Sequence, residues 1–327
     1  MPQPQWRGLP TGYFTHELVD SPNPLAHAPE SPERMEAIET RLLAAGMDDA
    51  LRRVACGPAP REAVLLAHDA DYIEALCQAS EGDPEALKRF DQPDTLVGPN
   101  TFRSAMASAG AVVRAVDALC APGARTIKNA FCAVRPPGHH AGRAHAAGFC
   151  YINNAAVGVL YAIERYGLSR VALVDIDAHH GDGSEEILAG NPKVQFFSLF
   201  QWPLYPNKRL EPTPENVTAS PLAAGADGAD VRAVLDREWL PKLDAFEPEL
   251  IVLSAGFDAH TEEHLAQLKV SEVDFAYMTR KLLEAAERHA QGRFLSVLEG
   301  GYSPRSLARS VLTHLQVLLR AGLLPSG

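Results

Sequence analysis

The sequence has no apolar run long enough to cross a bilayer, and its first residues contain no apolar signal core. Its five cysteines are odd in number and widely scattered, which favours reduced thiols and matches no thiolate metal pattern. The formal net charge of -11 argues against non-specific nucleic-acid binding, which needs cationic patches over phosphate. A small cationic substrate is compatible with this charge. These absences predict a cytoplasmic enzyme whose partners include neither a membrane nor a nucleic acid.

No internal repeat, low-complexity tract or obvious linker divides the chain. Its 327 residues can bury a sizeable core as one large α/β domain or as two small ones. The apolar fraction of 46% and the charged fraction of 22% are those of an ordinary globular protein. Since nothing separates two units, we predict a single domain over residues 1–327.

Short apolar runs alternate with segments that have helical features along the chain. The runs are typical of buried strands and lie at residues 63–67, 129–134, 170–177, 193–199, 250–258 and 293–302. The other segments show helical spacing or helix-start residues and lie at 31–42, 101–120, 153–166, 231–243, 271–292 and 307–319. Ser271 to Asp274 has the form of a capping box. This alternation predicts a mainly parallel sheet covered by helices on both faces.

The stretch at residues 171–183 departs most from ordinary core chemistry. Four apolar residues are followed by acids, two histidines and two glycines, which is typical of a buried strand that enters a polar loop. Asp175, Asp177 and His179 alternate, so they project from one side of an extended backbone and can converge on one cation. Burying three such groups together is very costly unless a metal or a proton network compensates them.

Other chemically unusual residues follow three further predicted strands. His139 and His140 come after the strand at 129–134, while Asp258 and Tyr302 end two later ones. Ligands of open α/β sheets bind at the carboxyl ends of the strands. We therefore expect all of these residues to lie close to Asp175, Asp177 and His179 at one edge of the sheet.

Together these residue types describe metal-assisted amide hydrolysis. Asp177, His179 and Asp258 would supply three ligands of an N/O metal site and leave positions open for water and substrate. Such a metal lowers the pKa of its water and polarises a carbonyl. The adjacent pair His139 and His140 suits proton transfer, from the water and then to a leaving amine.

Three further side chains complete this set. Asp175 and Asp182 are natural carboxylate partners that fix the histidine tautomers. Tyr302 follows two glycines and can donate a hydrogen bond to a developing oxyanion opposite the metal. His180 is expected to be a structural neighbour, because successive residues of an extended strand face opposite ways. Ordinary roles are expected for the rest, with His68, His260 and His264 in loops or on the surface and Cys150 as a small buried residue.

Five motifs resemble those of the zinc-dependent histone deacetylase superfamily, in the same order: RPPGHHA at 135–141, GFCYINN at 148–154, DIDAHHGDG at 175–183, SAGFDA at 254–259 and EGGY at 299–302. The chain looks most like the class II-like bacterial deacetylases and acetylpolyamine amidohydrolases. The resemblance implies an arginase-like, three-layer α/β fold with an eight-stranded, mainly parallel sheet. It also implies an enzyme with one zinc ion per chain. This enzyme would remove acyl groups from acetyl-lysine side chains, or alternatively from acetylpolyamines or another small acylated amine.

The resemblance also implies roles for individual residues. Zinc ligands are implied at Asp177, His179 and Asp258, catalytic histidines at His139 and His140, and a carbonyl-polarising tyrosine at Tyr302. A structural monovalent cation, K+, would use Asp175, the backbones of Asp177 and His179, Ser198 and Leu199. Substrate contacts are implied at Gly148, Phe149 and Tyr205 in the tunnel wall, Asp94 and Leu265 at the rim, and Arg34 near an internal acetate channel.

The rim of the expected tunnel bears on the choice of substrate. Polyamine-preferring members carry an acid seven residues after the third zinc ligand, and Leu265 stands at that place here. This difference favours acyl-lysine. The loop at residues 205–209 lacks the glycines that usually follow its proline and adds positive charge to the rim.

Two other classes of protein remain open. A ureohydrolase of the arginase kind shares the sheet but needs a second bridging metal, and the tandem histidines with Tyr302 argue against it. A metal-dependent binding protein without turnover would be expected to lose Tyr302 or a histidine, and this chain retains them. The sequence leaves the acyl chain length and the formation of a homo-oligomer open.

Overall fold

The computed structural model describes residues 5–90, 92–209 and 211–320. At its centre lies one eight-stranded sheet with the strand order β2-β1-β3-β8-β7-β4-β5-β6. Every neighbouring pair is parallel. The strands are β1 (Thr11–Thr15), β2 (Leu51–Ala55), β3 (Asn129–Cys132), β4 (Val171–Asp175), β5 (Val194–Gln201), β6 (Val217–Leu222), β7 (Leu250–Ala255) and β8 (Phe294–Leu298). The predicted parallel α/β fold is confirmed.

Helices connect the strands and cover both faces of the sheet. They are α1 (Glu33–Ala44), α2 (Arg61–Val64), α3 (Ala70–Ser80), α4 (Pro84–Leu87), α5 (Thr101–Cys120), α6 (Asn154–Tyr166), α7 (Asp182–Leu188), α8 (Gly228–Val234), α9 (Leu240–Phe246), α10 (Glu272–His289) and α11 (Pro304–Leu319). Short helical turns lie at η1 (Gln5–Gly8), η2 (Glu17–Asp20), η3 (Asp48–Ala50) and η4 (Leu235–Trp239), the last joining α8 to α9. Within the described ranges, no helix is both long and apolar enough to span a membrane.

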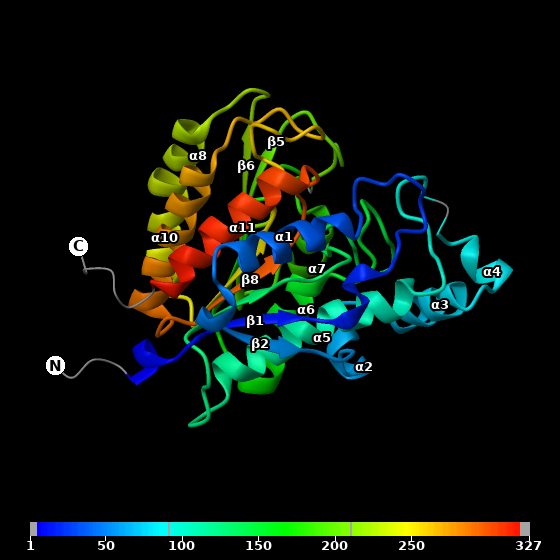
Figure 1. Ribbon diagram of the computed structural model, residues 1–327, viewed down its shortest axis with the longest axis horizontal. Coiled ribbons are helices and arrows are strands. Elements are labelled where there is room, and N and C mark those ends of the chain that lie inside the picture. Colours follow the sequence, from blue (N-terminus) through cyan, green and yellow to red (C-terminus); the bar gives the residue numbers. More distant parts are fainter. Residues whose placement is uncertain (1–4, 91, 210, 321–327) are drawn as a thin grey trace.

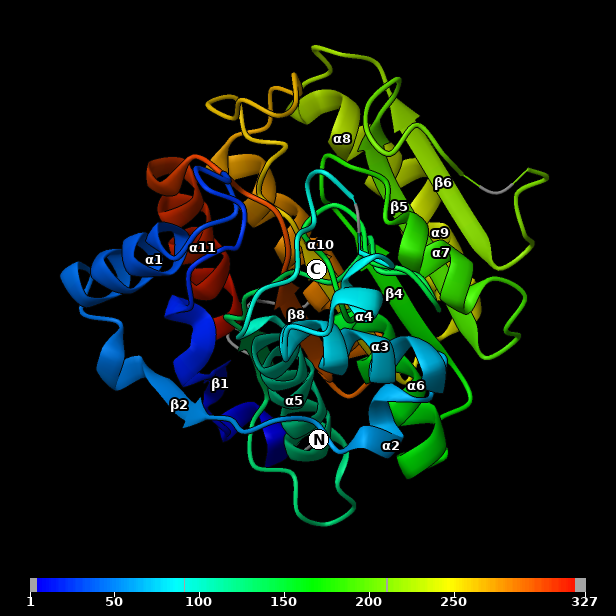
Figure 2. The ribbon, with the colours of Figure 1, turned by 90° about the vertical axis from the view of Figure 1, so that its right-hand side faces the viewer.

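Two apolar clusters fill the spaces between the sheet and its two helix layers. Val171 and Leu173 of β4 pack in one cluster with residues of α5 and α6. Ala172 and Val174 of the same strand pack in the other cluster, with residues of α1, α10 and α11. Figures 1 and 2 show these two groups of helices on opposite faces of the sheet. Because both faces of β4 are buried, its sequence is a continuous apolar run rather than an alternating one.

The outer parts of the sheet differ from the sequence expectation. Residues 63–67 were expected to form a strand, but a helical turn, α2, begins after Pro60 and buries Ala63 and Val64. The prediction was wrong because a short apolar run fits a buried helical turn as well as a strand. The sequence did not indicate β1, β2 and β6, and two of these are the edge strands β2 and β6. Pro221 in β6 is tolerated because an edge strand has a free side.

The segment before β8 follows the sequence closely. α10 begins at the predicted capping box, in which the Ser271 side chain accepts from the third helical N–H and Asp274 binds back to the Ser271 backbone. Gly292 lies beyond its end with a φ of +68°, a conformation that glycine adopts without strain. β8 begins two residues after Gly292, and the loop after β8 leads to Tyr302.

Candidate active site

Four adjacent central strands, β3, β8, β7 and β4, end at the same edge of the sheet. The loop after β3 carries His139 and His140, the loop after β8 carries Tyr302, and the loop after β7 carries Asp258. Asp177 follows β4, which lies beside β7. Side chains far apart in the sequence are thus brought together because neighbouring parallel strands end side by side.

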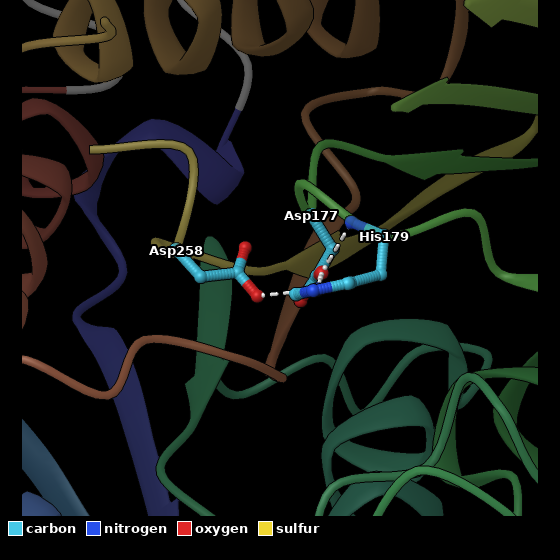
Figure 3. Close-up of side chains that lie close together, drawn as sticks. All are labelled: Asp177, His179 and Asp258. Atoms are coloured by element: carbon cyan, nitrogen blue, oxygen red, sulfur yellow. Dashed lines mark hydrogen bonds and ion pairs between the residues drawn. The ribbon is translucent and has the colours of Figure 1, made fainter. Parts of the chain in front are cut away.

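Asp177, His179 and Asp258 point toward one another (Figure 3). Each offers one potential ligand atom, and these atoms all lie within 4.8 Å of one another. Nδ1 of His179 is 3.0 Å from Oδ1 of Asp177 and 2.9 Å from Oδ2 of Asp258. All three residues are buried, and they form the one such group of three or more found in the described ranges.

Backbone groups hold the two carboxylates of this triad. The Gly300 N–H donates to Oδ2 of Asp177 at 2.9 Å, and the Ala178 N–H donates to Oδ1 of Asp258 at 2.7 Å. A Cβ on Gly256 would overlap Asp177, and a Cβ on Gly300 would overlap Asp258. Glycine at these two positions lets the backbone approach the carboxylates and fix them.

The charges of the triad favour a bound cation. Burial lowers the pKa of His179, but the carboxylates of Asp258 and Asp177 outweigh burial and raise it to about 10. Burial and the Asp177 charge raise the pKa of Asp258 to about 7. One imidazole nitrogen and two carboxylates are a donor set that divalent transition metals accept, with positions left open. The residues therefore fit a catalytic metal ion.

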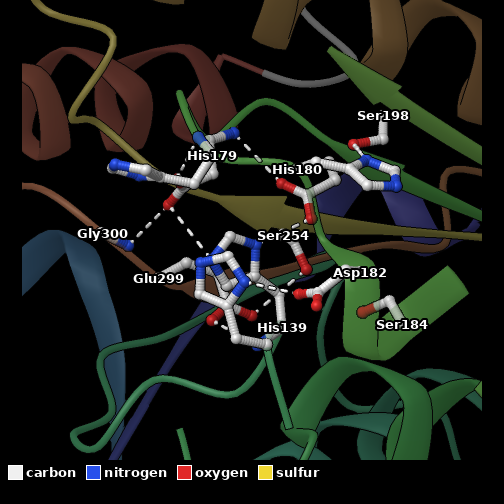
Figure 4. A network of polar contacts seen from close by, with 12 residues as sticks. His139, His179, His180, Asp182, Ser184, Ser198, Ser254, Glu299 and Gly300 are labelled. Atoms are coloured by element: carbon white, nitrogen blue, oxygen red, sulfur yellow. Dashed lines mark hydrogen bonds and ion pairs between the residues drawn. The ribbon is translucent and has the colours of Figure 1, made fainter. Parts of the chain in front are cut away.

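His139 and His140 lie with their ring centroids 4.0 Å apart, but their partners differ. Nδ1 of His139 is 3.0 Å from Oδ2 of Asp175, and Nδ1 of His140 is 2.8 Å from Oδ1 of Asp182. Figure 4 shows His139 and Asp182 in a polar network that also includes His179. Each histidine thus has one ring nitrogen held by a buried carboxylate, which fixes its tautomer and orientation.

The surroundings shift the pKa values of the two histidines in opposite directions. Burial lowers the pKa of both, but Asp177 and Asp175 together raise the pKa of His139 well above its ordinary value. Burial and the charge on His139 lower the pKa of His140 to about 4. The lowered pKa of His140 favours its neutral form, and a neutral imidazole is the form that accepts a proton.

Glu299 belongs to this network, although the sequence analysis gave it no role. Its buried carboxylate accepts hydrogen bonds from the N–H groups of Gly138 at 2.7 Å and His139 at 3.1 Å, and from the Ser254 hydroxyl at 3.2 Å. Burial raises the pKa of Glu299 to about 7. Glu299 therefore fixes the turn that carries the tandem histidines. Two signals in the sequence could have indicated it: its position at the end of a buried strand and its place in the EGGY motif.

A pocket of about 210 Å³ reaches the triad from the surface. It is lined by Asp94, His140, Gly148, Phe149, His179, Tyr205, Leu265 and Tyr302. Sites for drug-sized ligands occupy about 300–1,000 Å³, so this pocket suits a narrower ligand. The Phe149 ring lies 5.7 Å from the Tyr302 ring, and the Tyr205 ring lies 5.1 Å from His140. The two predicted wall aromatics thus flank the pocket rather than the core.

The pocket wall needs glycine at position 148. Gly148 has a φ of +53°, and a Cβ there would lie 2.5 Å from Cδ2 of His140 and 3.1 Å from Cε1 of Tyr205. The next N–H, that of Phe149, donates to the Thr95 hydroxyl at 3.0 Å. Thr95 in turn donates to Asp94 at 2.7 Å, which ties this rim acid to the wall.

Arg34 is the one predicted substrate-binding residue that does not line this pocket. It is fully buried, and its guanidinium lies 5.1 Å from the centre of the Tyr302 ring. Its Nε donates to the Gly301 carbonyl at 2.7 Å, and a second nitrogen donates to the Glu299 carbonyl. The structure therefore places Arg34 behind the tyrosine, where it holds the backbone of the loop after β8.

The residues predicted for a monovalent cation lie on β4 and β5. Asp175 and Ser198 are register partners and both are fully buried. Oδ1 of Asp175 accepts from the Asp177 N–H at 3.1 Å, and the Ser198 hydroxyl is 2.9 Å from Nδ1 of His180. Leu199 follows in the same buried strand. The structure brings these residues together, and cation binding by them stays a prediction.

The remaining histidines divide into buried and exposed ones. His68 and His260 lie in loops, as expected, but both are buried: His68 accepts from the Asn153 N–H at 2.9 Å and His260 accepts from the Glu262 N–H at 3.0 Å. A lone histidine gives no sequence signal of such a partner. His264 is exposed and Cys150 is buried, as predicted.

Comparisons with known proteins point to one family. The histone deacetylase domain profile matches residues 28–318. A histone deacetylase-like amidohydrolase of Pseudomonas aeruginosa is 36% identical over 303 residues, covering 90% of this chain and 76% of that protein. Polyamine deacetylase HDAC10 of Mus musculus is 34% identical over 304 residues, covering 89% of this chain but only 45% of the longer mouse protein. The crystal structure of the HDA15 HD domain matches with a TM-score of 0.87 and 28% identity, covering 96% of this chain and 90% of that one.

Proposed function

Because this chain belongs to the histone deacetylase family, we propose that it is a zinc-dependent amidohydrolase that removes acetyl groups from acetyl-lysine side chains and releases acetate. The observation that carries the proposal is the buried triad of Asp177, His179 and Asp258. It adjoins a narrow pocket that His140 and Tyr302 also line. A metal site, a proton carrier and a hydroxyl donor therefore face the same small volume.

Zinc would be held by Asp177, His179 and Asp258, and when bound it polarises the substrate carbonyl and lowers the pKa of water. Tyr302 would donate a hydrogen bond to the carbonyl oxygen as that oxygen gains negative charge. Burial raises the pKa of Tyr302 well above its ordinary value, so its hydroxyl keeps the proton that it must donate.

His140 would carry the proton between water and the leaving amine. Its Nδ1 is held by Asp182 at 2.8 Å, so the proton would be taken up at Nε2 and Asp182 would stabilise the imidazolium. His139, with Asp175 at 3.0 Å, lies against it, and positive charge on His139 would disfavour that imidazolium. His140 would therefore pass its proton readily to the amine, and the free lysine side chain would leave.

The pocket walls support a slender acylated chain as substrate. Phe149 and Tyr205 flank the pocket and would exclude water from an aliphatic stem. Leu265 at the rim offers no charge to a second ammonium group, which favours acyl-lysine in a protein or peptide over a polyamine. Acetylpolyamine is the second candidate, because one relative is named as a polyamine deacetylase.

A structural K+ behind the zinc is part of the same proposal. Asp175 is a buried carboxylate beside the buried Ser198 hydroxyl, and the backbones of Asp177, His179 and Leu199 would supply further oxygens. Replacing K+ with Li+ in the buffer would then lower the melting temperature of the zinc-loaded protein. An unchanged melting temperature would contradict this part of the proposal.

The test compares the purified zinc form on an acetyl-lysine peptide and on acetylputrescine, side by side. A higher kcat/KM on the peptide supports the proposal, and a higher value on acetylputrescine moves it to the second candidate. Tyr302→Phe should keep its zinc and lose about 100- to 1,000-fold in kcat. One zinc per chain without acetate release from either substrate would contradict amide hydrolysis, and two metals per chain would favour a ureohydrolase.

A further inference from the structure

The backbone that carries Tyr302 has little conformational constraint of its own. Gly300 and Gly301 precede the tyrosine, and Gly301 has a φ of +126°, which L side chains rarely adopt. Ser303, the N-cap of α11, makes no side-chain capping bond. Contacts from other parts of the chain must therefore select the conformation of this loop.

Besides Asp177, which accepts from the Gly300 N–H, two side chains make such contacts: Arg34 and Glu263. Arg34 binds carbonyl groups of the loop, as described above. Oε2 of Glu263 accepts from the N–H of Tyr302 at 2.7 Å and from the N–H of Ser303 at 3.2 Å. This carboxylate lies at the start of α11, where the helix dipole stabilises a negative charge. The carbonyls and the N–H groups of the tyrosine loop are thus held by side chains of opposite charge.

Glu263 is itself held firmly. Its side chain is buried, with an exposed fraction of 8%. Its Oε1 accepts from the His264 N–H at 2.8 Å, and its own N–H donates to the His260 carbonyl at 2.9 Å. The surrounding loop is closed by a bond from the Thr261 N–H to the Val270 carbonyl at 2.9 Å. The carboxylate therefore has a defined position from which to orient another group.

We infer that Glu263 is a positioning residue that aims the Tyr302 hydroxyl at the substrate carbonyl, an inference that rests on the proposed function. Glu263 lies in the loop that begins at the metal ligand Asp258 and also supplies Leu265 to the pocket wall. One loop thus joins the metal site, the tyrosine and the rim. Loss of the Glu263 carboxylate would leave two N–H groups without their acceptor and would let the tyrosine move relative to the metal.

A double-mutant cycle tests this role. Glu263→Ala should keep its zinc and its KM but lose about tenfold to 100-fold in kcat, the cost of a catalytic group misplaced by up to an ångström. In a Tyr302→Phe background the same substitution should change kcat by less than about twofold, because the hydroxyl to be aimed is already absent. A purely structural role would not produce this difference between backgrounds.

Two further variants serve as controls. Glu262→Ala removes a neighbouring carboxylate that is paired with Arg309 at 2.6 Å on the surface, and it should keep wild-type kcat. Glu263→Gln keeps an oxygen that can accept from both N–H groups, and it should recover most of the activity lost in Glu263→Ala.

Two outcomes would overturn the inference: an equal loss of kcat in both backgrounds, or no loss in the wild-type background. If Glu263→Ala does not retain zinc, the cycle is run with Glu263→Asp, which withdraws the carboxylate by one methylene, under the same criteria. Failure of the proposed function gives a different result, because the wild-type protein would then release no acetate or Tyr302→Phe would lose no activity.

Discussion

The base of the pocket and its rim are built in different ways. At the base, Asp177 and Asp258 are fully buried, and backbone N–H groups hold both carboxylates. At the rim, Tyr205 and Leu265 are each 38% exposed and stand on loops. The base follows four adjacent strands of the sheet, so the core positions it, whereas partly exposed loops carry the rim. Changes at the base should therefore affect catalysis, and changes at the rim should affect the choice of substrate.

Removing a ligand at the base should have the largest effect. Asp258→Ala leaves Asp177 and His179 as the remaining members of the triad, so we expect loss of both zinc and acetate release. Atomic absorption and an acetate assay measure the two losses. Asp94→Ala, the same truncation at the rim, should keep one zinc per chain. An Asp258→Ala variant that retained full zinc would show that the triad is not the metal site.

A smaller change at the junction of base and rim should reduce turnover without loss of metal. In Gly148→Ala the new Cβ would press on the His140 ring, so we expect kcat to fall by about 100-fold while zinc stays bound. Gly190→Ala is the matched control: its φ of +74° carries a similar backbone strain, but no atom lies within 4 Å of the added Cβ. Equal activity of the two variants would mean that the close approach to His140 is unimportant.

The central part of the fold was predictable because burial on both faces leaves a clear pattern. β4 and β7 are continuous apolar runs, and the expected segments contain them. β2 was missed because three of its five residues, Arg52, Arg53 and Ala55, are exposed and two of the five are arginine. An edge strand is defined by its one neighbour, and a sequence does not show which segment that neighbour is.

The prediction of the site was limited in the same way, because a sequence does not show which distant residues are in contact. The triad and the tandem histidines were found because several chemically unusual residues stand together in short motifs after strands. Glu299 begins the EGGY motif and Glu263 is a single acid in a polar loop, and the roles of both come from N–H groups far along the chain. Arg34 was expected near an internal acetate channel, which stays a prediction, and the sequence did not indicate its bonds to the carbonyls of Gly301 and Glu299 behind Tyr302. Long-range partners of single polar residues exist only in the folded chain.

Zinc binding at the base should depend on pH. The pKa of His179 is raised to about 10, so in the metal-free protein this histidine carries a proton at pH 7. Zinc needs the deprotonated nitrogen, so binding should release that proton, and affinity should fall about tenfold for each pH unit from pH 10 down to pH 7. Below pH 7 affinity should fall more steeply, because the Asp258 carboxyl, with its pKa raised to about 7, is then protonated as well. Calorimetric titration in two buffers with different ionisation enthalpies measures the release. An identical heat in both buffers would contradict it.

The smallest expected effect concerns the rim, where Leu265→Glu would place a carboxylate at the pocket mouth. The one free ammonium group of acetylputrescine could pair with it, and an exposed ion pair is worth about 0.2–1 kcal/mol. The ratio of kcat/KM for acetylputrescine to that for the peptide should therefore rise only about twofold to fivefold. Leu65→Glu adds the same charge at a leucine that is 37% exposed outside the pocket lining, and it should leave the ratio unchanged. The gain should shrink at high salt, because exposed charges are screened. If the rise in the kcat/KM ratio persisted at high salt, residue 265 would select the substrate by shape rather than by charge. The rim would then have a more fixed conformation than its exposed side chains indicate.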